Sequence, residues 1–89
     1  MPIVEIPPPF RGTTEGESSV EVDGATVLAC IEAVGRRYPG FRELVVDDAN
    51  RVRGWAHVYR NDEALEADGL GATLAPGDAV RILASIGGG

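Results

Sequence analysis

The sequence predicts a small α+β domain in which a mixed sheet of four to five strands packs on one main helix. One segment in the first half carries apolar residues at helical spacing. Several short segments alternate between apolar and polar side chains or are rich in β-branched residues. Because a helix with one apolar face must bury it, we expect these strands to form a single sheet under the helix. The 89 residues suffice for one such domain.

Two strands are expected before the helix. Residues 2–6 are rich in β-branched side chains and stop at Pro7–Pro9, because proline has no N–H to donate to a strand ladder. Residues 18–22 alternate between polar and apolar side chains. Glycine, threonine and charged residues fill residues 10–17. The two strands are therefore expected to form a hairpin with a long loop.

The helix is the clearest element, and it is expected to follow Thr26 and to end before Pro39–Gly40. The Thr26 hydroxyl suits the N-cap, and Arg36 and Arg37 suit the last turn, where cations complement the helix dipole. Residues 41–45 allow one further short helical turn. The apolar face comprises Val27, Cys30, Ile31 and Val34.

The remaining strands follow a polar loop and are separated by turn-rich segments. They are residues 55–60, the short 63–65 and the final 79–86. The order is thus an initial hairpin, a crossover helix and later strands, of which the last can pair parallel to the first at the centre of the sheet. A parallel pair requires a long connection such as this helix. The order predicts the β-grasp arrangement.

Composition and charge argue against several function classes. The net charge is −6, and all eight basic residues are arginine. An acidic domain lacks the positive surface that nucleic acids require and is repelled by anionic membranes, so neither is an expected partner. The charge serves solubility or, alternatively, attracts a basic protein partner. One cysteine and one histidine permit no internal disulfide and none of the Cys-rich or His-rich metal sites.

Location follows from what the sequence lacks. No apolar stretch approaches the roughly 18 residues that a membrane helix needs. The N-terminal residues have neither the basic region nor the apolar region of a signal peptide. We therefore expect the protein in the cytoplasm.

Several segments and a glycine pair carry a family resemblance. The segments are DGATVLACIEAV (23–34), RRYPGFRE (36–43), HVYRNDE (57–63), LAPGDAVRIL (74–83) and the final Gly88–Gly89. From Ser18 onward the chain resembles the ubiquitin-like sulfur carriers of bacteria, and most closely the branch that serves cysteine synthesis. A glycine pair this soon after a strand is a more specific sign of the family than the turn sequence Pro76–Gly77–Asp78 before that strand, which is common. Many such carriers have Pro at the position of Ala84 and Ala or Ser at that of Gly87, and both departures loosen the tail.

The resemblance implies a ubiquitin-like β-grasp domain over residues 1–85 and a flexible C-terminal glycine tail over residues 86–89. It also implies that the protein is a co-substrate rather than an enzyme. The carboxylate of Gly89 would be adenylated at the expense of ATP by a ubiquitin-activating-type adenylyltransferase and converted to a thiocarboxylate, with a sulfurtransferase or sulfide as the sulfur source. The tail contains Gly87, Gly88 and Gly89, and the absence of side chains at the last two positions would let it enter a narrow channel. An acceptor enzyme of cysteine, cofactor or secondary-metabolite biosynthesis would then take the sulfur.

The resemblance leaves alternatives open. The chain could be the small subunit of a molybdopterin synthase, a modifier joined to lysines of other proteins, or a plain binding module with an idle tail. The absence of lysine prevents lysine-linked chains of the protein on itself. No cofactor is expected to be bound, since ATP belongs to the activating partner. The free protein is expected to be a monomer.

The side-chain candidates are partner-binding residues rather than catalytic ones. Alternation in the third strand predicts a row on the open sheet face, with Ala56 and Val58 facing the helix. The row comprises Trp55, His57 and Tyr59, joined by Leu83, and Ile86 is a further candidate at the start of the tail. Alternatively, loops cover the row or Trp55 caps the core. His57 has no neighbour that suggests a catalytic base.

Two other sets of residues have a structural and a functional interpretation. Cys30 lies on the apolar helix face and is expected to be a core residue, not a sulfur-handling thiol. The acidic residues are expected to be solvated, or else to dock a basic rim of the activating enzyme. They are Asp47, Asp48, Asp62, Glu63 and Glu66.

Overall fold

The computed structural model describes residues 1–85, and over this range it contains a five-stranded mixed sheet in the order β2-β1-β5-β3-β4. The strands are β1 (Ile3–Glu5), β2 (Ser19–Glu21), β3 (Ala56–Arg60), β4 (Glu63–Ala64) and β5 (Ala79–Ala84). The helices are α1 (Val27–Arg37), the short α2 (Phe41–Val45) and the 3₁₀ helix η1 (Pro8–Phe10). β1 and β5 run parallel, and the other neighbours are antiparallel. This confirms the predicted β-grasp fold with its single main helix.

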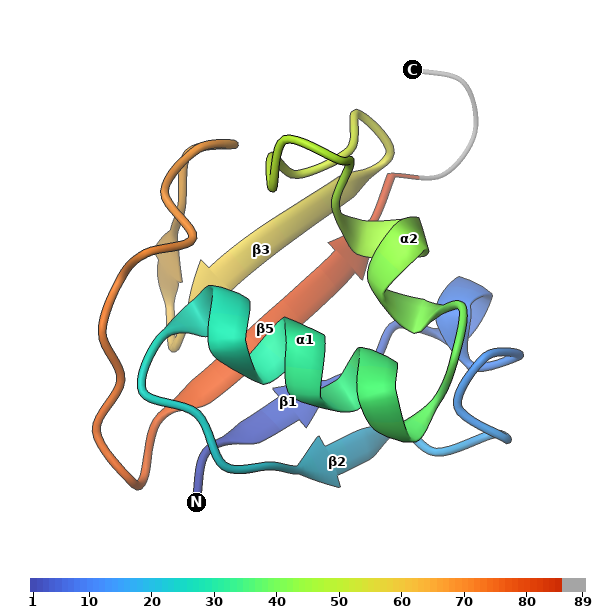
Figure 1. The fold of residues 1–89 in the computed structure, drawn as a ribbon, viewed down its shortest axis with the longest axis horizontal. Helices are drawn as coiled ribbons and strands as arrows, with labels where there is room; N and C mark the ends of the chain where they lie inside the picture. The colour runs from blue at the N-terminus through green and yellow to red at the C-terminus, as the bar shows by residue number, and fades with distance from the viewer. Residues whose placement is uncertain (86–89) are drawn as a thin grey trace.

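The helices and the sheet form two layers. Figure 1 shows α1 crossing one face of the sheet, with α2 beside it. The core lies between the layers, because alternate strand residues point toward the helices. The buried strand residues are Val4, Val20, Ala56, Val58, Val80 and Ile82, and the helices contribute Val27, Cys30, Ile31, Val34, Phe41 and Val45. The expected direction of Ala56 and Val58 is thus confirmed.

The main helix begins and ends as its sequence predicts. The Thr26 hydroxyl accepts a hydrogen bond from the Ala29 N–H at 3.1 Å, which satisfies one of the unpaired N–H groups of the first turn. Arg36 and Arg37 lie in the last turn. Gly40 then adopts a φ of 100°, a conformation that glycine tolerates, and lets α2 start immediately.

All five strands are shorter than predicted, and one segment forms a helix that was not expected. The proline segment forms η1 and buries Phe10 instead of continuing as an open turn, since proline is well placed in the first turn of a helix. β3 begins at Ala56, because residues 54–55 form a turn. The final strand ends at Ala84. Ile86 and the predicted tail lie outside the described residues, so the division into residues 1–85 and 86–89 stays a prediction.

Candidate functional site

The candidate site begins with the sheet face that bears neither α1 nor α2. In the central strands, residues that alternate with the buried ones point to this face. Leu83 has 46% of its surface exposed, His57 is exposed and Tyr59 is half-buried. The β3–β5 register places His57 opposite Leu83. The structure therefore brings these three predicted residues together on adjacent strands.

Tyr59 and Leu83 also share a depression with a charged residue. Tyr59, Arg81 and Leu83 line a hollow of about 240 Å³ on this face. Tyr59 stands opposite Arg81 in the β3–β5 register. An apolar side chain and a ring beside a guanidinium form a small surface that can receive an apolar group of a partner together with an acceptor of hydrogen bonds.

Arg81 is a residue of this face that the sequence did not single out. Its Nε lies 3.3 Å from Glu5 Oε1, and its Nη1 lies 3.2 Å from Asp62 Oδ1. Both ion pairs are exposed, so they contribute little stability. They hold the guanidinium of this β5 residue between β1 and the turn that follows β3. Partners 76 and 19 positions away in the sequence cannot be found by local patterns.

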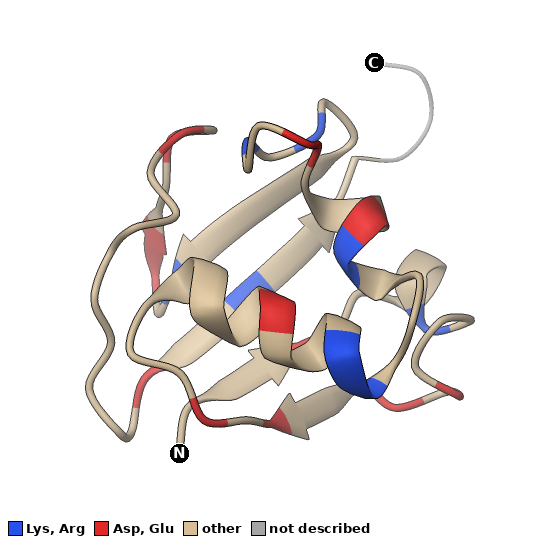
Figure 2. Ribbon diagram, in the orientation of Figure 1, with Lys and Arg blue, Asp and Glu red and all other residues tan. Residues whose placement is uncertain are grey.

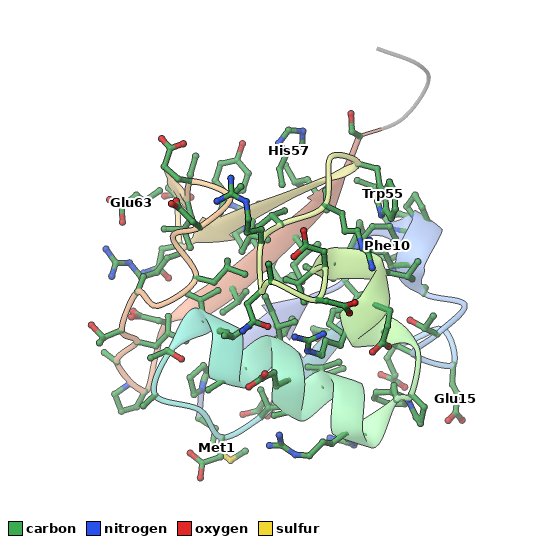
Figure 3. All side chains as sticks on the ribbon, turned by 45° about the horizontal axis from the view of Figure 1, so that its top comes forward. Met1, Phe10, Glu15, Trp55, His57 and Glu63 are labelled. Carbon is green, nitrogen blue, oxygen red and sulfur yellow. The ribbon has the colours of Figure 1, made fainter. Side chains whose placement is uncertain are left out.

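Trp55 does not lie in the predicted row. Its indole N–H donates to the Leu44 carbonyl in α2 at 2.8 Å, which directs the ring toward the helices. In Figure 3, His57 projects away from the sheet, whereas Trp55 lies beside α2. Strand alternation fails here because residue 55 precedes β3 and belongs to a turn. Trp55 is therefore set apart from His57, Tyr59 and Leu83, but 48% of its surface is exposed, and its role in binding a partner stays a prediction.

Trp55 instead joins α2 to the end of β5. The guanidinium of Arg53 stacks over its ring at 5.5 Å, and Arg53 Nε donates to the Glu43 carbonyl at 3.0 Å. The Trp55 carbonyl accepts a hydrogen bond from the Ser85 N–H at 2.7 Å. Ser85 is the last described residue, so this bond fixes the chain directly before Ile86 and the three glycines of the predicted tail.

The acidic candidates differ in what they do. Asp47 Oδ1 accepts N–H groups of Arg51 and Ala49, and these bonds, that of Arg51 foremost, hold the pKa of its carboxyl below the ordinary value. Glu63 pairs with Arg60. Asp48 and Glu66 are exposed. Figure 2 shows acidic residues on several loops, on both helices α1 and α2 and on strands β2 and β4.

Cys30 is completely buried, which confirms its prediction as a core residue. Burial raises the pKa of its thiol, and the negative charge of Asp23 adds to the effect. Such a thiol is a poor nucleophile. Among residues 1–85, no group of three or more potential ligands could hold a metal ion. In the same range, no helix has the length and apolarity needed to cross a membrane.

Comparison with known proteins gives a consistent set of relatives. The chain matches the ThiS family over residues 4–89. The sulfur carrier protein CysO of Mycobacterium tuberculosis is 34% identical over 89 residues, which cover 97% of this chain and 96% of the relative. The crystal structure of the Amycolatopsis orientalis BexX/CysO complex contains a chain that superposes with a TM-score of 0.88 at 37% identity, with full coverage of both chains.

Two further solved structures share the fold. The crystal structure of M. tuberculosis CysO has a TM-score of 0.87 at 31% identity and covers 97% of this chain and 100% of its own. SAMP1 from Haloferax volcanii has a TM-score of 0.77 at 26% identity, with coverage of 99% and 98%.

Proposed function

Because the chain belongs to the ThiS family and its homology to sulfur carrier proteins supports a carrier role, we propose that it carries sulfur as a thiocarboxylate on Gly89. Sulfur carriers are small carrier proteins rather than enzymes. The observation that carries the proposal is the similarity to a sulfur carrier along nearly the whole of both chains. The family match extends through Gly87, Gly88 and Gly89.

The proposed chemistry has two steps on the Gly89 carboxylate. A carboxylate oxygen attacks the α-phosphorus of ATP in the partner's site, and pyrophosphate leaves. Hydrosulfide then attacks the carbonyl carbon of the acyl adenylate, AMP leaves, and loss of the proton gives a thiocarboxylate. This chain binds no cofactor in the cycle. It offers a narrow glycine segment, because side chains at residues 88 and 89 would obstruct a channel.

The open sheet face is the proposed docking surface for the activating adenylyltransferase. His57, Tyr59 and Leu83 are the side chains that support this assignment, since they gather on one face near the end of β5. Ile86 lies outside the described residues and stays a predicted contact. The charged carrier then docks on an acceptor enzyme and gives up its sulfur. The BexX/CysO complex is a complex of a relative of this chain, which supports binding to partner proteins.

We place this cycle in the cytoplasm, where ATP is available to the partner, and propose a monomer as the free form. The test is the intact mass of the protein isolated from its native host, with the modified fragment located. The expected species is heavier by the difference between a sulfur and an oxygen atom. It carries the added mass in its C-terminal fragment and reacts with thiol reagents. Locating the fragment excludes oxidation of Met1 or Cys30.

A matched variant sharpens that test. Deleting Gly88–Gly89 should abolish the heavier species while leaving the thermal unfolding of residues 1–85 unchanged. If only the free acid is found, even after incubation with ATP, sulfide and the adenylating enzymes of the host, the proposal is wrong. If the protein that lacks Gly88–Gly89 is also inactive, the alternative of a binding module with an idle tail is excluded.

A second candidate function is protein modification through the same glycine. The similarity to SAMP1, a small archaeal modifier protein, favours it. Both functions use an acyl adenylate and differ in the nucleophile that follows. Recovery of Gly89 in isopeptide linkage to lysines of other proteins would support the modifier. Stable co-purification with one larger subunit would instead indicate a permanent synthase subunit.

A further inference from the structure

We propose that the outer edge of β2 binds an extended, basic segment of a partner protein as an added strand of the sheet. β2 is the last strand on one side of the sheet, and Figure 1 shows it at the rim. β1 separates this edge from β5 and β3, which carry Leu83 and His57. The edge is therefore a second surface, and its assignment does not depend on the proposed sulfur-carrier function.

The backbone of β2 has unpaired hydrogen-bonding groups on its outer side. The Ser18 carbonyl and the Val22 N–H bond to the residues that flank β1, at 2.8 and 3.1 Å. Because the direction of these bonds alternates along an antiparallel strand, the N–H and carbonyl groups of Ser19 and Glu21 point away from β1. Within residues 1–85, no other segment bonds to them. Two donors and two acceptors are thus available for a ladder with an added strand.

A hollow lies beside this edge, at the end of α1. It has a volume of about 290 Å³, and Arg37 and Tyr38 line it together with β2 and the preceding Glu17. In an added strand, the side chain opposite Val20 points toward the layer of the helices, as the buried Val20 does. An apolar side chain at that position enters the hollow and packs on the Tyr38 ring, over which the Arg37 guanidinium already stacks at 5.5 Å.

The charge around the edge indicates the sign of the partner. Residues 15–23 contain the exposed carboxylates of Glu15, Glu17, Glu21 and Asp23 and no basic residue, which gives this segment a charge of −4. Opposite charges on neighbouring strands stabilise a sheet, and like charges destabilise it. A basic side chain in the added strand, opposite Glu21, therefore complements the edge.

The same charges argue against a second copy of this chain as the occupant. Pairing two β2 edges would bring two segments of charge −4 together, in proteins that each carry −6. Charged side chains on an edge strand are a common device against such self-association. The opposite edge of the sheet offers less, since β4 has only two residues, Glu63–Ala64. The observations thus favour a basic strand from another protein at β2.

The test is an NMR titration of isotope-labelled full-length protein with end-capped peptides. The probe peptide alternates lysine with valine, which places cations on one side of an added strand and apolar side chains on the other. One control peptide has glutamate in place of lysine. A second control keeps the lysine–valine sequence but carries N-methyl groups on the backbone nitrogens of its lysines, so these cannot donate to the carbonyls of Ser19 and Glu21.

At saturation with the lysine–valine peptide, we expect the Ser19 and Glu21 amides to exchange with solvent at least about threefold more slowly. The amide of Val20, which faces β1, should keep its rate. Both control peptides should bind at least about tenfold more weakly, one because of its charge and the other because it lacks the hydrogen bonds.

Two variants test the edge from the side of the protein. Glu21→Gln should raise the dissociation constant of the probe about threefold, the effect of one cross-strand charge pair. Asp48→Asn, which removes one exposed carboxylate outside this segment, is the matched control and should have a smaller effect. Ser19→Pro removes an N–H that faces outward, so the β1–β2 ladder should persist while binding weakens at least about fivefold. If Ser19→Pro fails to fold, the N-methylated peptide still decides.

Absence of binding by the lysine–valine peptide at millimolar concentration overturns the proposal. Equal binding of the N-methylated peptide does so too, since only charge attraction would remain, and so do equal effects of Glu21→Gln and Asp48→Asn. Spectral shifts confined to His57 and Leu83 would place the peptide on the other surface and overturn it. Protection of the Ser19 amide that rises with protein concentration alone would make a second copy the occupant, which also overturns it.

Discussion

Leu83 is the residue on which docking through the open face is expected to depend most. It is a large apolar side chain with 46% of its surface exposed, and it stands opposite His57. Covering the exposed half of a leucine contributes about 1 kcal/mol to binding. Leu83→Ala should therefore raise KM for the carrier about fivefold in adenylation assays, with little change in kcat.

A second truncation serves as the control for location. Leu28 lies on α1 and packs against the core on the helix-covered side of the sheet. Leu28→Ala should lower the free energy of unfolding and leave KM unchanged. If both truncations raise KM equally, the activating enzyme does not dock on the open face.

Asp78 shows what a polar residue does in the turn before β5. Its Oδ2 accepts the Ala75 N–H at 2.8 Å, and its Oδ1 accepts the side-chain amide of Asn61 at 3.1 Å. Asn61 in turn accepts the Ala79 N–H at 2.9 Å. The sequence PGD thus forms a turn that is bound to the turn between β3 and β4. The backbone bond of Ala75, followed by the Asn61 amide, lowers the pKa of Asp78 below 3.8.

The lowered pKa predicts a pH dependence of stability. A carboxyl whose pKa is lower in the folded state stabilises the fold above its unfolded value of 3.8, and this contribution is lost as pH falls through the folded pKa. Asp78→Asn should therefore be less stable than wild type at pH 7, and the difference should shrink below pH 3.8. Urea unfolding at several pH values measures it. Asp48→Asn, an exposed carboxylate, is the control, and an equal effect of both variants would refute the assignment.

At the scale of elements, α1 and α2 meet at a glycine. A Cβ added to Gly35 would lie 2.8 Å from Arg42 Cβ, so α2 would have to shift. Such overpacking costs about 1–3 kcal/mol, against a gain in helix propensity of about 1 kcal/mol from replacing glycine. Gly35→Ala should thus lower the free energy of unfolding by about 1 kcal/mol net. Chemical denaturation measures the change.

Gly12→Ala is the matched control, since an added Cβ at Gly12 has nothing within 4 Å. It should leave stability unchanged or raise it slightly. A stabilised Gly35→Ala would show that α2 moves freely against α1. That outcome would also weaken the view of α2 as a fixed support for Trp55.

The elements could be predicted because their signals are local. The apolar spacing from Val27 to Val34 and the Thr26 cap define α1, and the structure has both. The parallel pairing of β1 and β5 follows from the order of the elements, and it too is present. The start of β3 at Ala56 rather than Trp55 was harder to predict, because the alternation of side chains holds only inside a strand. The sequence contains no local signal that residue 55 bonds to residue 44.

The candidate site was predicted only in part for the same reason. His57, Tyr59 and Leu83 follow from alternation within strands that were correctly located. Arg81 was missed because its ion pairs join distant segments, and Gly35 because its neighbour lies on the next helix. Contacts between elements need the packed molecule. The glycines at 87–89 were recognised by sequence alone and lie outside the described residues.

At the scale of the whole molecule, the charge of −6 carries a prediction about association. Long-range attraction speeds the encounter of an acidic protein with a basic partner, and salt screens it over about 8 Å at physiological ionic strength. If the activating enzyme presents a basic rim, the association rate constant should fall several-fold as salt rises from about 0.05 to 0.5 M. Stopped-flow or surface-binding kinetics measure this dependence.

Two double variants separate net charge from the position of charge. Asp48→Asn with Glu66→Gln removes two exposed carboxylates of the candidate docking set, and Glu15→Gln with Glu17→Gln removes two exposed carboxylates in the loop before β2. Both leave a net charge of −4, from −6 + 2. Since steering depends on charges near the contact, the first pair should slow association more than the second. Equal slowing of association by the two double variants would mean that only the net charge matters. An association rate constant that does not change with salt would show that the activating enzyme presents no basic rim.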